Sequence, residues 1–459
     1  MTLAHSDERP HPAVLAALDA VGLRDVPLAI DARDEMLSHL LRAHRGAIGA
    51  ALVGYFQTGW MAAGLLRRVL GWRFGERGRS RLLDFAGGYG RVSRYFRPGA
   101  EPVHITVADV DPEAVEFQRR RFGFEGFVST SDPDDLEIET RFDAVFVASL
   151  FSHLPERRFA AWLHRLQRLL APGGVLVLST HGPDAMLPGR TMPAGGLYFE
   201  TVSESRRLSG DEYGSTWVSE EFMAQAITEA SGGGASWRRF PRALWHSQDL
   251  WVVVPEPAAD LSALDLRPGP RGYLDSCYLG APERLVISGW AAEPGDGEVE
   301  VTVTVDGAPP ATVKPSRPRP DARPEIGSAA ERAGWELRID NPEPFALTDL
   351  IVVTAASPRG RHVVHAGRLE TAGLYLDLLR TAREADRLRD ERERAVAELR
   401  GVRTALAVES RRVAELDAAV HRLGWEKHLL EQRLEAIERS RFWRLRRAWF
   451  RFTGRGEEG

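Results

Sequence analysis

A glycine-rich turn between an apolar run and a polar segment constrains the fold of this 459-residue chain more than any other feature. Residues 81–96 read RLLDFAGGYGRVSRYF. The apolar part predicts a strand that ends near Asp84, and the part from Arg91 predicts a helix. Glycines adopt backbone angles that other residues avoid, and they let a ligand approach the main chain. The turn therefore predicts a ligand site at the end of this strand.

A second carboxylate follows the next apolar run. Asp109 comes directly after residues 103–108 and 21 positions after Gly88. In nucleotide-binding βαβ units, an acidic residue at this separation binds the ribose hydroxyls. Dinucleotide sites need a third glycine where Ser93 stands here, and Asp84 favours a cationic amino group over a pyrophosphate. The pattern predicts an adenosine-containing ligand, with a plain strand-to-helix turn as the simpler alternative.

Strands and helices alternate after this turn. The pattern predicts a strand, a loop, a helix and a strand at 142–148, 149–155, 160–170 and 175–179. It then predicts a helix at 219–230, capped by Ser219, and an antiparallel strand pair at 236–240 and 250–254. This order is typical of an α/β fold with a doubly wound, mostly parallel sheet. The glycine- and proline-rich stretch 182–213 is predicted to be a loop that covers the acceptor substrate.

The motif D-x-(G/A)-x-G-x-G and the run FDAVFVASLFSHLPE…LLAPGGVLVLSTHG resemble the class I, Rossmann-like methyltransferases that use S-adenosylmethionine. The resemblance covers about residues 40–255. It implies S-adenosyl-L-methionine as cofactor, with its contacts at Asp84, Ala86, Gly88, Gly90, Asp109, Asp132 and Ser149. Ala86 departs from the family pattern, which has a glycine there, and the surroundings of Asp132 match the family poorly.

Methyl transfer to a hydroxyl group needs a base, and histidine serves this purpose near neutral pH. His153 and His181 follow neighbouring predicted strands, so both are expected at the rim of the site. Either residue is a candidate catalytic base, although His153 could instead cap its own loop. No cluster of histidines and carboxylates has the spacing of metal ligands, so no metal is expected.

The remaining chain divides into several predicted parts. Residues 1–80 are a helical lead-in, in which Tyr55 either covers the cofactor or packs on the sheet. After the methyltransferase domain at 81–255 comes a proline-rich linker at 256–271. Residues 272–370 contain short alternating runs that predict a small all-β sandwich. This part resembles modules attached to bacterial enzymes of surface-polysaccharide assembly, and Trp290 and Trp335 either bind carbohydrate or belong to its core.

Residues 373–439 carry an almost unbroken heptad. It starts at Leu378 and Thr381 and predicts a left-handed coiled coil, hence a homo-oligomer with a rod on the order of 90 Å long. Arg392, Glu409 and Lys427 interrupt its apolar seam. A single solvated helix is the alternative.

Residues 440–459 mix arginines with aromatic residues. An amphipathic helix of this composition is typical of a contact with an anionic membrane, and docking on a partner protein is the alternative. The net charge of −5 and the motifs give no reason to expect nucleic acid. The single cysteine, Cys277, and the lack of an apolar span or leader favour the cytoplasm.

These features lead to three functional interpretations. The first is a cytoplasmic, membrane-peripheral methyltransferase that acts on a sugar hydroxyl of a glycan intermediate in surface-polysaccharide synthesis. The second is a non-catalytic scaffold whose degenerate methyltransferase fold recruits glycosyltransferases. The third, an enzyme of dinucleotides or nucleotide sugars, is disfavoured by Asp84 and Ser93.

Overall fold

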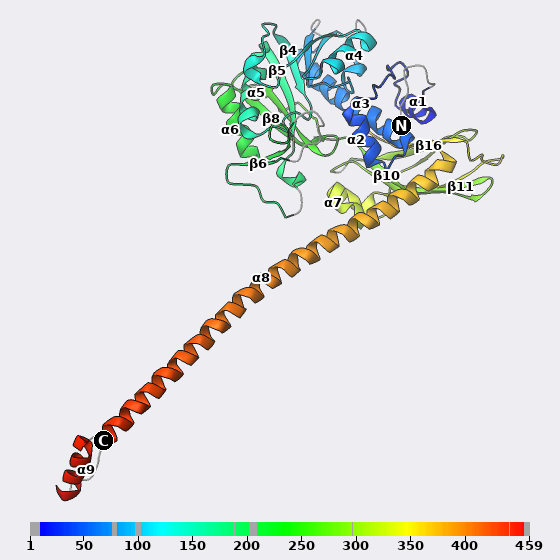
Figure 1. Ribbon diagram of the computed structural model, residues 1–459. Helices are drawn as coiled ribbons and strands as arrows, with labels where there is room; N and C mark the ends of the chain where they lie inside the picture. The colour runs from blue at the N-terminus through cyan, green and yellow to red at the C-terminus, as the bar shows by residue number, and fades with distance from the viewer. Residues whose placement is uncertain are drawn as a thin grey trace. The chain divides into compact units, whose positions relative to one another are not determined.

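The computed structural model describes residues 10–75, 80–96, 102–186, 189–201, 209–295, 297–439 and 441–453. The chain divides into two compact units, Met1–Leu379 and Arg380–Gly459. The first contains all the sheets, and the second is helical (Figure 1).

A seven-stranded sheet forms the centre of the first unit. Its order is β3-β2-β1-β4-β5-β9-β8. The strands are β1 (Ser80–Phe85), β2 (Val103–Asp109), β3 (Glu125–Val128), β4 (Phe142–Val147), β5 (Leu170–Thr180), β8 (Ser236–Leu244) and β9 (Gln248–Val254). The pairs from β3 to β5 are parallel, whereas β9 is antiparallel to both β5 and β8. The predicted doubly wound sheet and its antiparallel end are confirmed.

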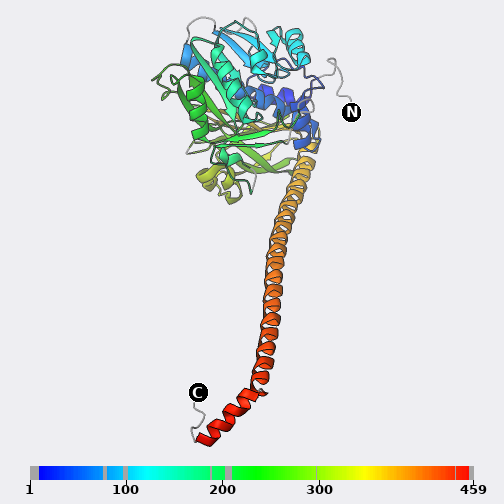
Figure 2. The same cartoon turned by 60° about the vertical axis from the view of Figure 1, so that its left-hand side comes forward.

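Helices cover both faces of this sheet because its buried strands are apolar on both sides (Figure 2). One face packs on α1 (Pro12–Ala20), α2 (Glu35–Ala43) and α3 (Ile48–Phe74). The other packs on α5 (Glu156–Arg168) and α6 (Glu220–Ala230). α4 (Pro112–Phe122) joins β2 to β3. The hydroxyl of Ser219 accepts a hydrogen bond from the Phe222 N–H, so the predicted N-cap of α6 is confirmed.

Two local predictions were wrong. The described residues after the glycine turn form only a 3₁₀ turn, η1 (Ser93–Tyr95), where a helix was expected. The guanidinium of Arg94 is buried there and donates to the carbonyls of Gly90 and Ala29, which ties the turn to the lead-in segment. The expected loop at 182–213 contains η3 (Pro183–Ala185) and β6 (Leu197–Glu200), and β6 pairs with β7 (Ser215–Val218). Residues 187, 188 and 202–208 of that loop lie outside the described residues.

Two antiparallel sheets follow. One is formed by β10 (Arg271–Ala281), β11 (Arg284–Ala292) and β14 (Gly334–Asp340). The other is formed by β12 (Glu300–Val305), β13 (Ala311–Val313), β15 (Leu350–Ser357) and β16 (Gly360–Arg368). The two sheets share one apolar core. Three short helical segments lie between β13 and β14 in the sequence: η4 (Pro320–Ala322), α7 (Arg323–Ile326) and η5 (Gly327–Arg332). Trp290 and Trp335 are buried, which excludes them as an exposed carbohydrate platform in this conformation.

The segment predicted to be a linker is packed in the core on one face of the seven-stranded sheet. Leu261, Leu264 and Leu266 are buried in the same core as α1 and α3, and that core also takes in Val352 and Val363 from β15 and β16. Gln57 on α3 accepts a hydrogen bond from the Val363 N–H at 2.7 Å. The β-rich part is therefore joined to the first domain by a common core rather than by a free tether.

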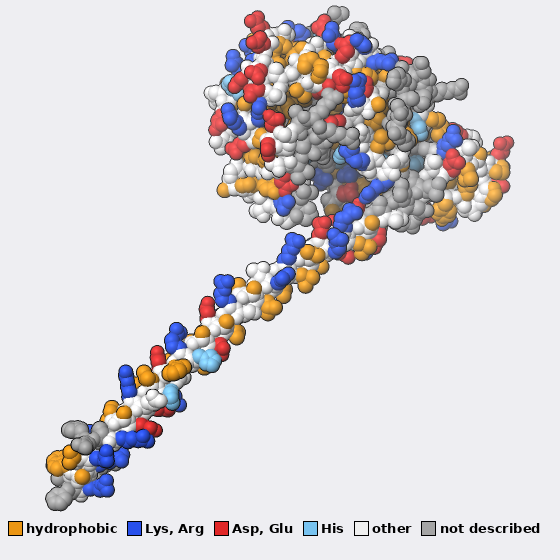
Figure 3. Space-filling model, in the orientation of Figure 1, with side chains coloured by type: hydrophobic (Ala, Val, Ile, Leu, Met, Phe, Trp, Pro, Cys, Tyr) orange, Lys and Arg blue, Asp and Glu red, His pale blue; other side chains and the backbone are white. Residues whose placement is uncertain are grey.

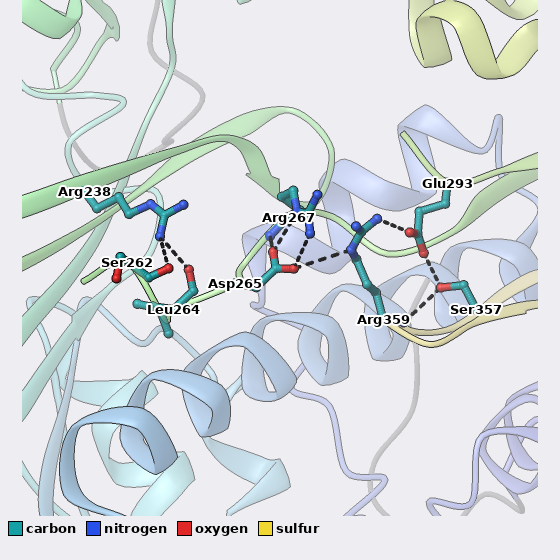
Figure 4. Close-up of polar contacts among 8 residues, drawn as sticks. All are labelled: Arg238, Ser262, Leu264, Asp265, Arg267, Glu293, Ser357 and Arg359. Atoms are coloured by element: carbon teal, nitrogen blue, oxygen red, sulfur yellow. Dashed lines mark hydrogen bonds and ion pairs between the residues drawn. The ribbon is translucent and has the colours of Figure 1, made fainter. Parts of the chain in front are cut away.

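Arginines reinforce this joint (Figure 4). The guanidinium of Arg238 on β8 donates to the carbonyls of Leu264 and Ser262. Arg359, in the turn between β15 and β16, forms ion pairs with Asp265 of the packed segment and with buried Glu293. A buried charge of this kind is tolerated because it is paired.

The second unit consists of most of α8 (Leu369–Arg439) and of α9 (Arg441–Thr453). The apolar residues of the heptad, here called the seam, are exposed along α8 (Figure 3). Between 53% and 68% of each is exposed: Leu388, Leu399, Val402, Leu406, Val413, Leu416, Val420, Leu423, Leu430, Leu434 and Ile437. The side chain of Leu378, where the heptad starts, lies outside the described residues.

Candidate functional site

A cavity of about 480 Å³ opens at the carboxyl ends of β1, β2 and β4. Open α/β sheets bind ligands at this edge because the strand order reverses there. Of the predicted cofactor residues, the cavity is lined by Asp84, Ala86, Gly88, Asp109 and Ser149. The wall is completed by segments from the lead-in, from the β3 end and from the β6–β7 region.

Asp84 is a buried carboxylate at the end of β1. Its Oδ2 atom has no hydrogen-bond partner among the described residues. Burial raises the pKa of this carboxyl to about 7, with a further contribution from the charge of Asp109. An unpartnered buried carboxylate is costly, so this cavity is built to receive a donor or a cation.

Asp109 holds the glycine turn in place. Its Oδ2 accepts a hydrogen bond from the Gly88 N–H at 2.8 Å, and its Oδ1 accepts one from the Asp111 N–H at 2.9 Å. Burial raises its pKa. Gly90 is absent from the cavity wall, and a Cβ at this position would come within 2.7 Å of the Phe122 ring. Gly90 therefore serves packing of the turn on α4 rather than ligand contact.

Ala86 adopts a left-handed backbone conformation, with φ at 57°. This conformation is unfavourable for a residue with a Cβ and is readily adopted by glycine. The backbone explains why the family pattern has a glycine at this position.

Ala86→Gly is expected to relieve this strain. The unfolding free energy should rise by about 0.5–1 kcal/mol, since the relief of roughly 1–2 kcal/mol is partly offset by the greater freedom of glycine in the unfolded chain. Chemical denaturation of the full chain measures the change. Ala114→Gly inside α4 is a matched control that should lower the stability, and equal losses in both variants would contradict the strain.

Ser149 also has a positive φ, of 61°, at the end of β4. Its N–H donates to the Ser179 hydroxyl, and its own hydroxyl accepts a hydrogen bond from the Gln248 side chain at 2.7 Å. The Gln248 amide nitrogen lies 3.4 Å from the Nε2 of His181. A polar network thus connects three neighbouring strands at the edge of the cavity.

The two histidines lie close together, but neither lines the cavity. Their ring centroids are 6.4 Å apart. The Nδ1 of His153 lies 2.7 Å from the Gly214 carbonyl, and its ring stacks at 4.5 Å on Tyr213, which does line the cavity. The prediction placed both imidazoles at the rim beside the methyl group; in the structure neither lines the cavity, and Tyr213 stacks on His153 while Gln248 lies beside His181.

Asp132 is not brought into the cavity wall. Its side chain caps η2 (Pro133–Asp135) and forms an ion pair with Arg158 at 2.9 Å. The preceding residues Ser129 and Ser131 line the cavity instead. The predicted contact residue Asp132 therefore lies outside the cavity wall, next to residues that form it.

Sequence reasoning considered a contact of the lead-in with the cofactor through Tyr55 but missed the residues that line the cavity. Arg33, Asp34 and Met36 line the cavity. Asp34 caps α2 and accepts a 2.6 Å hydrogen bond from the Tyr55 hydroxyl, so Tyr55 packs within the core and supports the wall indirectly. The N-cap pattern at Asp34 could have located the start of α2, but nothing local in the sequence indicates its contact with the distant strand ends.

The described residues contain no group of three side chains suited to a metal ion. Within the same residues, no helix combines the length and the apolar character needed to cross a bilayer.

Comparison with known proteins is consistent with this geometry. Residues 83–176 match the family model described as "Methyltransferase domain". A malonyl-[acyl-carrier protein] O-methyltransferase of Prosthecochloris aestuarii is 38% identical over 60 residues, 13% of this chain. The chain spans only 22% of the length of that relative.

Solved structures include a DhpI–SAH complex that is 20% identical. The matched region covers 49% of this chain and 97% of the DhpI chain, with a TM-score of 0.31. A Burkholderia thailandensis 1,6-didemethyltoxoflavin-N1-methyltransferase is also 20% identical, covering 50% and 92% with a TM-score of 0.32. The family match agrees with the sequence prediction over residues 83–176, which include most of the residues that line the cavity.

Proposed function

We propose that this protein is an S-adenosylmethionine-dependent methyltransferase whose cofactor occupies the cavity at the strand ends. The observation that carries the proposal is the buried, unpartnered Oδ2 of Asp84 inside a methyltransferase domain. The methionyl end of the cofactor carries an ammonium group that would pair with this carboxylate.

The other residues that line the cavity fit the remaining parts of S-adenosylmethionine. Arg91 lines the cavity, stacks on Trp245 at 4.3 Å and carries the positive charge that a carboxylate needs. Asp109 lies at the end of β2, where ribose hydroxyls bind in this type of sheet. Leu154 and Trp162 supply an apolar wall for a purine ring.

The bound cofactor supplies an electrophilic methyl group, and the protein positions the acceptor and receives its proton. The Gly214 carbonyl can only accept, so the Nδ1 of His153 donates and the Nε2 carries the basic lone pair. We therefore keep His153 as the proposed base, with His181 as the second candidate. Because Tyr213 lies between His153 and the cavity, the phenol group or a water would have to relay the proton, or Tyr213 would have to move.

His153→Ala is expected to lower the turnover by about 100-fold or more while the affinity for the cofactor persists. His181→Ala is the matched comparison. Stopped assays of S-adenosylhomocysteine release, combined with calorimetry, separate the two effects. Unchanged turnover in the His153 variant would transfer the role to His181.

We propose that the acceptor is a sugar hydroxyl of a surface-polysaccharide intermediate. The resemblance of the β-rich part to modules of such enzymes supports this. The two sheets of that part share one core, as a small β-sandwich would. Incubation with S-adenosylmethionine and lipid-linked glycans should release S-adenosylhomocysteine and yield an O-methyl sugar by mass spectrometry. An acyl-carrier substrate is the control, and cofactor binding without turnover on either would favour the scaffold.

The C-terminal helix α9 is proposed to contact an anionic membrane at the cytoplasmic face. Leu445 and Trp449 are 69% and 58% exposed, and the helix carries Arg444 and Arg447. The side chains of Phe442, Trp443 and Phe452, which the sequence places on the same amphipathic helix, lie outside the described residues.

Removal of residues 440–459 is expected to abolish flotation with anionic liposomes, because apolar insertion and arginine attraction are lost together. Neutral liposomes are the control and should bind the full chain much more weakly. A full chain that does not float with anionic liposomes would refute the membrane contact.

A further inference from the structure

The seam of α8 leaves an apolar stripe exposed on a helix of 71 residues, interrupted at Arg392, Glu409 and Lys427. Off the seam, polar and charged residues predominate, although Val396, Val408, Trp425 and Leu429 are also exposed there. Such a helix gains little from its own packing, so the stripe indicates a partner helix. The stripe repeats every seven residues, which matches the spacing of a second helix wound left-handedly around the first. Pairing through this stripe is independent of the proposed enzymatic function.

Charges beside the seam show which helix fits. In a parallel coiled coil, the residue before the first seam position of a heptad faces the residue five positions later in the partner. Five such pairs are charged on both sides in α8. Four have opposite signs: Glu384 with Arg389, Glu398 with Arg403, Arg412 with Asp417, and Arg433 with Glu438. The chain is therefore complementary to its own copy in register.

The fifth pair, Glu426 with Glu431, has like charges. Lys427 lies in the seam between them, and its ammonium is 3.7 Å from the Glu431 carboxylate within one helix. The cation therefore offsets the local repulsion. Arg392 is another charged residue at a seam position. In a two-stranded coil, the Glu391 carboxylate of the second copy would lie beside the level of the seam that contains Arg392. A two-stranded coiled coil tolerates charged residues at first seam positions better than larger bundles do, because the charged ends of the side chains can reach solvent.

A shift of one heptad halves this complementarity. In register, the four opposite-sign pairs occur twice by symmetry, giving eight. After a shift of seven residues four remain: Asp377 with Arg389, Glu391 with Arg403, Glu391 with Arg389, and Arg433 with Glu431. Each exposed pair contributes modestly, but the loss of four favours the in-register arrangement.

We propose that α8 pairs with α8 of a second copy of this chain as a parallel, in-register, two-stranded coiled coil. In this arrangement the two α9 helices follow the same end of the coil. Two linked amphipathic helices bind a membrane more strongly than one, because the second engages at a high effective concentration.

Single cysteines at two seam positions test the orientation in the full chain. Leu399→Cys and Val420→Cys should each give a disulfide-linked dimer under mild oxidation, and light scattering should give twice the 50.9 kDa chain mass. A symmetric antiparallel pair has one midpoint, so only one of the two positions could meet its own copy. The native Cys277 is buried, and burial raises its pKa to about 12, so the parent chain should remain uncross-linked. Arg411→Cys, which the heptad places away from the seam, should cross-link at least tenfold more slowly.

A charge-exchange series tests the register. Changing Glu384 and Glu398 to Arg places like charges opposite Arg389 and Arg403, and dimer affinity should fall about tenfold or more. Adding Arg389→Glu and Arg403→Glu to the same chain should restore it. Cross-linking at only one seam position, a monomeric or trimeric mass, or a charge exchange that leaves affinity unchanged would each overturn the proposal.

Discussion

Asp84→Asn is expected to weaken S-adenosylmethionine binding by about 10- to 100-fold, because a charge-assisted hydrogen bond to the ammonium group is lost. In the parent protein the pKa of Asp84 is about 7, and the carboxylate form is the one that pairs with a cation. The affinity should therefore fall as the pH drops below about 7, and this dependence should disappear in the variant. Calorimetry between pH 5.5 and 8 measures both effects.

The same substitution should stabilise the ligand-free protein. The folded-state pKa of Asp84 lies above its usual value, so the folded state binds more protons between about pH 4 and 7 and loses stability as the pH rises through that window. At pH 8 the variant should gain on the order of 2–4 kcal/mol, with little change at pH 4. Asp143→Asn at the opposite end of the sheet is the control, since Asp143 accepts a hydrogen bond from the Arg81 N–H. A variant that loses stability at pH 8 and keeps full cofactor affinity would remove Asp84 from the site.

A chain truncated after Pro255 is expected to aggregate or to melt roughly 10 °C or more below the parent. The truncation removes Leu264, Leu266, Val352 and Val363 from the core that contains α1 and α3. Each such side chain contributes about 1.5–3 kcal/mol when fully buried, so the summed loss of roughly 6–12 kcal/mol is comparable to the usual margin of stability.

A chain truncated after Leu379 is the matched control, since it keeps the whole first unit. It should melt cooperatively near the temperature of the parent. A soluble, cooperatively folded fragment ending at Pro255 would show that the two parts fold independently, as the linker interpretation of residues 256–271 implies.

The sheet was predictable from the sequence because its signals are local. The apolar runs of β1 and β4 and the glycine turn between β1 and η1 each identify an element from a few adjacent residues. Asp84 and Asp109 were found in the same way, since their position at strand ends fixes their position in the cavity.

The wrong sequence predictions concern features that depend on contacts between distant residues. The buried guanidinium of Arg94 selects a 3₁₀ turn over a helix, and no local pattern reveals its acceptors at Ala29 and Tyr55. Similarly, proline and polar residues suggested a tether at 256–271, while its three leucines are buried in a core whose other members lie far away in the sequence in both directions. For His153, the sequence gives the strand end correctly but says nothing of Tyr213, which lies between the imidazole and the cavity.

The central claim is that the cavity at the ends of β1, β2 and β4 binds S-adenosylmethionine. Calorimetry of the full chain with S-adenosylmethionine, NAD and a nucleotide sugar, measured side by side at pH 8, tests it most directly. The account predicts one S-adenosylmethionine per chain, a loss of affinity in Asp84→Asn, and no binding of the other two ligands. No binding of S-adenosylmethionine, or tighter binding of NAD or the nucleotide sugar, would contradict it.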